Sequence, residues 1–294
     1  MSTAAPAASS AAADEAPPRA AASVVLLRDS ADGLQVLLLQ RHRDARVLGG
    51  LYVFPGGKVD PEDAAPEWVA HLDAPVGTLP ARLGEPGLTP AAAQALYVAA
   101  ARELWEEAGV ALVDAPAALA ALPAGAAAGG WRAQLAAAGV RLSTAALRPW
   151  SRWITPRNPP VGTPRFDTRF FLARLPAGAQ VRHDAFEASD SLWLTPRAAL
   201  QRYWAREIEL IPPQLMGLAQ LARHATVADA WAEAAGRTPP CIQPEQFRDG
   251  DCRAMCYPGD PLHPVAERAL PGPTRLRLVQ GRFEPFDGFA GWFA

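Results

Sequence analysis

Cysteine is scarce in this sequence. Its 294 residues contain three, Cys241, Cys252 and Cys256, which fall within one short region. An odd number in one segment does not form a disulfide framework, and a chain of this length does not need one to stabilise its core. Cys252 and Cys256 also lack the second Cys or His pair of a usual zinc site. These features favour ordinary loop cysteines in a protein of the reducing cytoplasm.

An excess of charge of either sign is also absent. The sequence has 28 Lys and Arg residues against 30 Asp and Glu, which gives a formal charge of -2 and a pI near 6.2. Proteins that hold long nucleic acids usually present a basic surface to the phosphate backbone. The composition therefore argues against a long polynucleotide partner, while a hydrophobic content of 50% is enough for a sizeable core.

Long apolar runs are missing as well. No uninterrupted run reaches the roughly 20 residues that span a bilayer, which argues against an integral membrane protein. The first segment, MSTAAPAASSAAADEAPPRAAAS, lacks the basic start and apolar stretch of a secretory signal, and it includes Asp14 and Glu15, which transit peptides avoid. This tract, rich in Ala, Pro and Ser, predicts a disordered tail over residues 1–20.

Strand and turn signals follow the tail. Residues 23–29 and 34–42 are rich in Val and Leu and flank the turn-forming sequence SADG, so they predict a β-hairpin. The segment LYVFPGGK predicts a third strand ending at Gly56 and Gly57, where the backbone can approach a ligand without a Cβ in the way. A helix is predicted from Thr89 and Pro90 to a stop at Gly109.

Three glutamates crowd the last turns of that predicted helix. Glu103 is three residues from Glu106 and four from Glu107, so their side chains share one face, where each like-charged pair costs about 0.2 to 0.5 kcal/mol. The negative end of the helix dipole adds to this cost. Arg102 can neutralise Glu106, four residues on, and the remaining carboxylates suit a hard divalent cation. The alternative is a solvated acidic face.

These segments resemble the box of the Nudix hydrolases, G-x5-E-x7-R-E-U-x-E-E-x-G-U, in which U is aliphatic. RELWEEAGV, residues 102–110, fits every defined position of the second half. The first half departs from the box, because Asp63 replaces its glutamate and residues 64–101, 38 positions instead of seven, separate Asp63 from Arg102. This excess predicts an insert over about residues 64–89, with an amphipathic stretch at Trp68–Leu72 and then a Pro/Gly-rich loop.

An interrupted box resembles the branch of the family that includes the mammalian peroxisomal coenzyme A diphosphatases. Their upstream pattern is close to L-L-T-x-R-[SA]-x3-R-x3-G-x3-F-P-G-G. The segment LLLQRHRDARVLGGLYVFPGG keeps both arginines, Arg41 and Arg46, whereas Leu39 and His42 depart from the pattern. Two arginines beside a diphosphate can bind its oxygens through charge-assisted hydrogen bonds. The alternative for them is a solvated strand end.

The resemblance implies an α/β fold, a Nudix α/β/α sandwich around a mixed β-sheet, for residues 21–206. A helical insertion is expected over 115–147, and residues 207–294 are expected to form an extension packed on the same domain. Within the extension, segments 212–223 and 226–237 predict helices and segment 274–286 predicts a hairpin. The extension either covers the far end of the substrate or only packs against the core.

Site residues follow from the resemblance in the same way. A Mg2+ or Mn2+ ion is expected at three carboxylates, Glu103, Glu106 and Glu107. Catalytic roles are expected for Arg102, Glu106, Glu107 and Glu187, the last chosen from a later loop ahead of Asp184 and Asp190. Contacts to the substrate are expected from Arg41, Arg46, Gly56, Gly57 and Lys58.

Three functions are compatible with these residues. The first is hydrolysis of coenzyme A or acyl-coenzyme A to 3',5'-ADP and a 4'-phosphopantetheine. The second is the same chemistry on ADP-ribose, a dinucleotide or another nucleoside diphosphate derivative, since the box does not set the substrate. The third is a nucleotide sensor without catalysis, against which the intact Glu103, Glu106 and Glu107 argue. A homodimer is left open.

Overall fold

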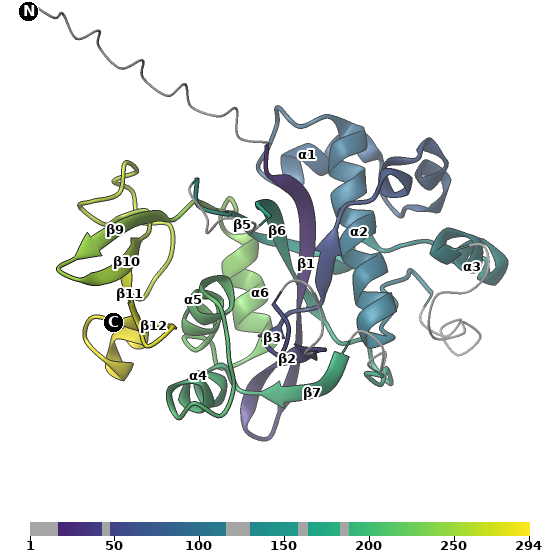
Figure 1. Ribbon diagram of the computed structural model, residues 1–294. Helices are drawn as coiled ribbons and strands as arrows, with labels where there is room; N and C mark the ends of the chain where they lie inside the picture. Colours follow the sequence, from purple (N-terminus) through teal and green to yellow (C-terminus); the bar gives the residue numbers. More distant parts are fainter. Residues whose placement is uncertain (1–16, 43–47, 116–129, 158–163, 183–187) are drawn as a thin grey trace, which may run out of the picture.

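A mixed β-sheet forms the centre of the protein (Figure 1). The computed structural model describes residues 17–42, 48–115, 130–157, 164–182 and 188–294. In these residues eight strands have the order β3-β2-β1-β6-β5-β8, with β4 paired to β1 and β7 to β2. They are β1 (Arg19–Ser30), β2 (Gly33–Arg41), β3 (Tyr52–Val53), β4 (Gly56–Lys58), β5 (Arg148–Ile154), β6 (Phe166–Arg174), β7 (Ala188–Leu194) and β8 (Cys241–Ile242). The sheet is mixed because β1 runs parallel to β6 and antiparallel to β2, and β1 and β2 form the predicted hairpin.

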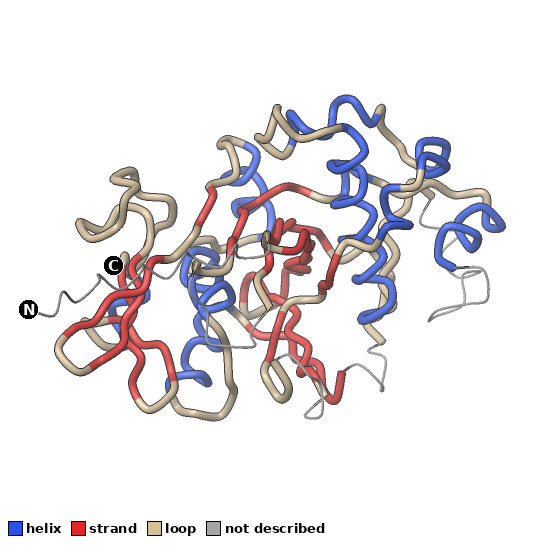
Figure 2. The backbone as a smooth tube through the Cα atoms, turned by 45° about the horizontal axis from the view of Figure 1, so that its top comes forward, coloured by secondary structure: helices blue, strands red, loops and turns tan. Residues whose placement is uncertain are grey.

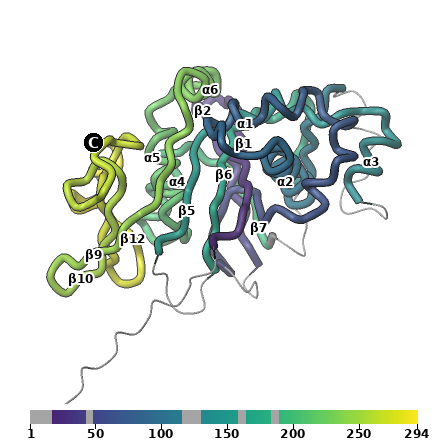
Figure 3. The backbone as a smooth tube through the Cα atoms, turned by 90° about the horizontal axis from the view of Figure 1, so that it is seen from above, coloured from purple at the N-terminus to yellow at the C-terminus, as the bar shows by residue number. Residues whose placement is uncertain are grey.

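Helices cover both faces of this sheet (Figure 3). Alternate residues of a strand point to opposite faces, and in β1 both sets are apolar. Val24 and Leu26 are buried in one core with helix α2 (Pro90–Ala108). Val25 and Leu27 are buried in a second core with helices α4 (Pro196–Trp204), α5 (Pro212–Leu221) and α6 (Val227–Ala235). The predicted α/β/α sandwich is confirmed.

Helix α2 begins and ends where the sequence predicts. The Thr89 side chain accepts a hydrogen bond from the Ala92 backbone N–H, and Pro90 occupies the first turn, where its missing N–H costs nothing. Gly109 ends the helix with φ of 65°, a left-handed conformation that favours glycine. These two ends fix the position of the acidic last turns relative to the sheet.

The insert after Asp63 contains short helices. The predicted Pro/Gly-rich loop is wrong for residues 76–82, which are helical, whereas residues 83–89 form turns as predicted. The helices are η1 (Pro61–Ala64), η2 (Pro66–His71), η3 (Val76–Thr78) and α1 (Leu79–Arg82). The Trp68 side chain from the predicted amphipathic stretch is buried, and Leu79 and Leu83 are buried in the same core as α2. Burial of these apolar side chains outweighs the turn preference of the nearby Pro and Gly residues.

Asp73 attaches this insert to the turn η5 (Thr144–Ala146). Its carboxylate accepts hydrogen bonds from Ser143 Oγ at 2.9 Å, from Thr144 N at 2.8 Å and from Thr144 Oγ1 at 2.6 Å. Burial alone would raise the pKa of Asp73, but the bonds from Thr144 and Ser143 outweigh it and lower the pKa below its usual value.

Replacing Asp73 with Asn is therefore expected to destabilise the protein at neutral pH by about 1 to 2 kcal/mol, because charged acceptors make the stronger hydrogen bonds. A carboxyl with a lowered folded-state pKa stabilises the fold above the unfolded value, about 3.9, and loses this contribution as pH falls through the folded value. Urea unfolding of both proteins at pH 7 and pH 3 measures this. The difference should shrink at pH 3, and a constant difference would contradict the assignment.

The structure describes only part of two other segments for which the sequence made a prediction. Of the helical insertion at 115–147, residues 130–138 form helix α3 (Gly130–Ala138), while residues 116–129 lie outside the described residues. The tail was predicted to reach residue 20, whereas β1 already begins at Arg19 and pairs with β6, and residues 1–16 are not described.

The chain after α6 adds a second sheet beyond helices α4 to α6 (Figure 2). Its antiparallel strands are β9 (Glu245–Asp249), β10 (Cys252–Cys256), β11 (Arg275–Val279) and β12 (Arg282–Pro285), followed by η6 (Phe289–Phe293). The helices at 212–221 and 227–235 and the hairpin of β11 and β12 match the predictions. Leu276 and Trp292 are buried with Leu215 of α5 in one core. Among the described helices, none is both long and apolar enough to cross a membrane.

Candidate active site

The glycine turn in β4 lies against the last turns of α2. Strand β4 pairs with β1, so that Gly57 faces Ala22 across the ladder. A Cβ on Gly57 would overlap the carboxylate of Glu103, and one on Gly56 would come within 2.5 Å of the Ala22 carbonyl oxygen. Glycine at both positions is therefore what allows this strand to approach the acidic face of the helix.

Glu107 connects the helix to this turn. It is the most buried of the three glutamates, with 8% of its side chain exposed, and Oε2 accepts a hydrogen bond from the Gly56 backbone N–H at 2.9 Å. Its other oxygen, Oε1, lies 3.7 Å from Nη1 of Arg41 at the end of β2. A buried carboxylate requires such partners. Glu107 thus holds together three elements that are far apart in the sequence.

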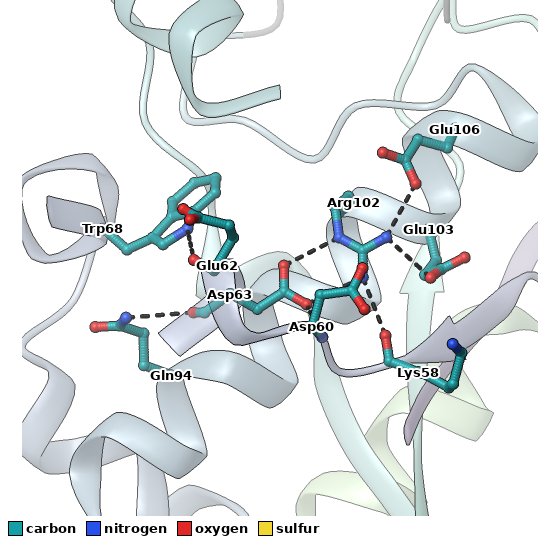
Figure 4. A network of polar contacts seen from close by, with 9 residues as sticks. All are labelled: Lys58, Asp60, Glu62, Asp63, Trp68, Gln94, Arg102, Glu103 and Glu106. Carbon is teal, nitrogen blue, oxygen red and sulfur yellow. Dashed lines mark hydrogen bonds and ion pairs between the residues drawn. The ribbon is translucent and has the colours of Figure 1, made fainter. Parts of the chain in front are cut away.

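Arg102 is the centre of a network of carboxylates (Figure 4). Nε and Nη2 donate to the two oxygens of Asp63, each at 3.0 Å. Nη1 donates to Glu103 at 2.9 Å and to Glu106 at 3.0 Å, and Nη2 also donates to the Lys58 carbonyl oxygen at 3.0 Å. The guanidinium offsets the repulsion between Glu103 and Glu106 and connects both to Asp63. The sequence predicted its contact to Glu106 but not the one to Glu103.

Asp63 occupies the box position at which the Nudix pattern has glutamate. Its side chain is 2% exposed, and it pairs with Arg102 across 39 positions of sequence. Burial by itself lowers the pKa of Arg102, but the hydrogen bonds to Asp63 and the negative charges of Glu103, Asp63 and Glu106 raise it above its usual value. Arg102 is therefore a permanent cation, and the insert leaves this ion pair intact.

The donor set of the helix fits a hard divalent cation. Three carboxylates lie on the last turns of α2, and Glu103 contacts the Gly57 backbone where a side chain would fill the space. Oxygen ligands of this kind suit Mg2+ or Mn2+. Among the described residues, no three His, Cys, Asp or Glu side chains already converge as a ligand cluster. Glu103 and Glu106 bind Arg102 instead, so coordination requires their carboxylates to rotate.

A cavity of about 460 Å3 reaches the same turn. Gly56, Gly57 and Arg41, which contact Glu103 and Glu107, belong to its lining, as does Lys58. Most other lining side chains are apolar, among them Phe54, Trp153, Phe166, Phe170, Ile211 and Met255. A pocket that is mostly apolar with a few polar groups at one place is typical of a small-molecule site.

Several of the predicted site residues lie together at the cavity and at the last turns of α2. Arg41 and Lys58 line the cavity, and Arg41 also contacts Glu107. Asp190, an alternative for the catalytic base, accepts a hydrogen bond from Tyr52 at 2.7 Å. Burial, and after it this hydrogen bond, raises the pKa of Tyr52 to about 12. Three predicted residues lie outside the described residues, namely Arg46, Asp184 and Glu187.

Several residues of the cavity lining were not predicted from the sequence. Trp153, Phe166, Gln214 and Met255 come from β5, β6, α5 and β10. Each has an ordinary place in the pattern of its own strand or helix, so no local signal marks it. These side chains meet only because the sheet and the C-terminal extension fold against each other.

The fold and this site define the class of the protein as a Nudix pyrophosphohydrolase. The family model described as the NUDT19 Nudix domain matches residues 2–221, which is most of the chain. The chain belongs to that family. Enzymes of the Nudix class generally use divalent metal ions.

Individual relatives agree with this family. The chain is 29% identical over 275 residues to acyl-coenzyme A diphosphatase NUDT19 of Homo sapiens, covering 79% of this chain and 73% of that protein. It is 28% identical over 275 residues to the protein of the same name from Gallus gallus, covering 78% and 73%. A crystal structure of a NUDIX hydrolase from Alicyclobacillus acidocaldarius superimposes with a TM-score of 0.56 at 28% identity, covering 74% of this chain and 96% of that one.

Proposed function

We propose that the protein hydrolyses the diphosphate linkage of coenzyme A or acyl-coenzyme A, giving 3',5'-ADP and a 4'-phosphopantetheine. The observation that carries this proposal is that the apolar cavity reaches the glycine turn beside the box glutamates. A substrate with a diphosphate next to an uncharged part matches this arrangement. The similarity to proteins named acyl-coenzyme A diphosphatase supports the same substrate class.

In this reaction the oxygen of water forms a bond to one phosphorus while the bond from that phosphorus to the bridging oxygen breaks. The other half of the substrate leaves as a phosphate monoester that keeps the bridging oxygen, and the water gives up a proton. One or more Mg2+ or Mn2+ ions held by the glutamates of α2 would offset the charge of the diphosphate and lower the pKa of a bound water. The bare backbone at Gly57 leaves room for phosphate oxygens near Glu103. Arg41 and Lys58 supply positive charge at the turn, and Arg102 orients Glu103 and Glu106.

Two further roles rest on the sequence alone. We propose Glu187 as the general base, and Arg46 as a second phosphate ligand beside Arg41. The composition also leads us to propose a cytoplasmic location, and a homodimer stays a prediction.

A substrate panel tests the proposed function. Coenzyme A, an acyl-coenzyme A, ADP-ribose and a dinucleotide are incubated with enzyme and Mg2+, and the products are identified by mass. We expect the highest kcat/KM for coenzyme A or its acyl ester, with 3',5'-ADP released. Faster cleavage of ADP-ribose would overturn the substrate assignment, and binding without cleavage of any compound would indicate a sensor.

Removal of the metal is expected to abolish activity without unfolding the protein. Helix α2 is held by its apolar face, since Ala101, Leu104 and Ala108 are fully buried. A chelator should therefore stop hydrolysis while Tm falls by only about 2 to 4 °C, the shift expected for roughly 1 kcal/mol in a chain of this size. Activity and thermal unfolding with and without EDTA measure this, and Mg2+ should restore turnover. Unfolding on chelation would show that the metal is structural.

A further inference from the structure

Gln214 belongs to the cavity lining and carries a buried hydrogen-bond acceptor that has no partner in the part of the chain that the structure describes. It lies in the first turn of α5, is 4% exposed and belongs to the cavity lining. Its Oε1 has no hydrogen-bond partner among the described residues. Buried polar atoms in folded proteins are almost always paired, because an unpaired one is destabilising. Gln220 Oε1, outside the cavity lining, is unpaired among the described residues in the same way, so the place of Gln214 in the lining is what matters: a ligand that offers a hydrogen-bond donor there would pair this oxygen.

The charge of the lining restricts which ligand can enter. Among the described lining residues the charged ones are Arg41 and Lys58, and both lie beside the glycine turn. The rest of the lining, to which Gln214 belongs, consists mostly of apolar side chains such as Trp153, Phe170 and Pro213. A phosphate group moved into that part would lose its hydration without meeting a cation. An uncharged ligand with an N–H group meets no such cost.

The C-terminal extension forms part of the same wall. Strand β8 pairs with β5, with Trp153 opposite Ile242, and thereby brings the following chain beside the central sheet (Figure 1). Pro244 and Met255 then line the cavity, and the ring of Tyr257 lies 6.0 Å from that of Trp153. The family match ends at residue 221, so this wall comes from chain beyond it.

We propose that the cavity binds the amide-bearing arm of coenzyme A and the acyl chain attached to it, with Gln214 Oε1 accepting a hydrogen bond from an amide N–H of the arm. This inference rests on the proposed function. The arm and the acyl chain are uncharged, and they suit an apolar wall. The adenosine end carries the 3'-phosphate and lies outside the cavity, across the diphosphate from the arm. Met255 of the extension then limits the acyl chain.

The two products separate the ends of the substrate and serve as binding probes. Calorimetry measures the affinity of 4'-phosphopantetheine and of 3',5'-ADP for the wild type and for Gln214→Leu, which removes the acceptor at similar size. We expect the variant to bind 4'-phosphopantetheine about 3- to 10-fold more weakly and 3',5'-ADP within about twofold of the wild type. Gln220→Leu is the control, because Gln220 is also a buried glutamine of α5 but lies outside the cavity lining.

A loss confined to 3',5'-ADP would place the adenosine end in the cavity and overturn this inference, and so would unchanged affinity for both products. Either outcome can be told apart from failure of the proposed function, because in that case the wild type would not hydrolyse coenzyme A. A preserved Tm verifies that each variant is folded.

A second variant tests the wall formed by the extension. Met255→Trp adds bulk where the acyl chain is expected, and Met255→Leu keeps the size. We expect Met255→Trp to lower the ratio of kcat/KM for octanoyl-coenzyme A to that for coenzyme A by about tenfold, as the loss of apolar contacts in a pocket commonly does. An unchanged ratio in the folded variant would show that the chain does not reach Met255.

Discussion

Glu107→Gln is expected to lower kcat by at least about a hundredfold while the protein stays folded. Removal of a group that stabilises charge in the transition state commonly has an effect of this size, about 2.7 kcal/mol or more. The amide keeps the size of the side chain, and its oxygen can still accept the hydrogen bond from Gly56. It cannot supply the negative charge that a divalent cation requires. The loss should therefore appear in turnover rather than in stability.

Steady-state kinetics with coenzyme A and Mg2+, together with thermal unfolding, measure this effect. Glu62→Gln is the matched control, because Glu62 is an exposed glutamate of η1 near the same network (Figure 4). It should keep kcat within about twofold of the wild type, as surface substitutions usually have small effects. A folded Glu107→Gln protein with near wild-type kcat would remove Glu107 from the catalytic group.

The acidic helix could be predicted because all of its signals are local. The Thr89 cap, the Gly109 stop and the spacing of three and four between the glutamates lie within one helix of the structure, α2. Helical periodicity alone then places Glu103 and Glu106 on one face. The role of Arg102 at Glu106 followed from the same spacing and is confirmed by a contact of 3.0 Å.

The cavity could not be predicted because its residues share no pattern in the sequence. Gln214 and Met255 are separated by the whole of α6 and by β8 and β9, and they meet through the pairing of β8 with β5. The helical turns at residues 76–82 of the insert were missed for the opposite reason. The Pro and Gly residues of the insert give strong local turn signals, whereas the burial of Leu79 and Leu83 against α2 depends on tertiary packing.

The interrupted box keeps the ion pair between Asp63 and Arg102. The insert leaves the chain after η1 and returns at Thr89, so the residues on either side of it, Asp63 and Arg102, still meet. Arg102 shares its donors between Asp63 on one side and the pair Glu103 and Glu106 on the other. Because Asp63 holds Nε and Nη2, Glu103 and Glu106 share the remaining nitrogen, Nη1, and we expect this to weaken the hold of Arg102 on the proposed metal ligands.

Asp63→Ala is accordingly expected to reduce both stability and activity. Breaking a buried ion pair by removing one partner commonly costs 3 to 5 kcal/mol, and we expect about 3 kcal/mol because Arg102 keeps its contacts to Glu103 and Glu106. Those contacts then tighten, so the Mg2+ concentration for half-maximal activity should rise and kcat should fall. Urea unfolding and Mg2+ titrations of activity measure the two effects separately.

Asp60→Ala provides the control, and a double-mutant cycle isolates the pair. Asp60 lies 3.6 Å from Arg102, but 56% of its side chain is exposed, so its removal should cost no more than about 1 kcal/mol. In the cycle of Asp63→Ala with Arg102→Ala, the double variant should be less destabilised than the sum of the single ones, because neither charge is left alone in the interior. Additive losses, or an unchanged Mg2+ requirement in Asp63→Ala, would show that the carboxylate of Asp63 does not hold Arg102 away from the glutamates.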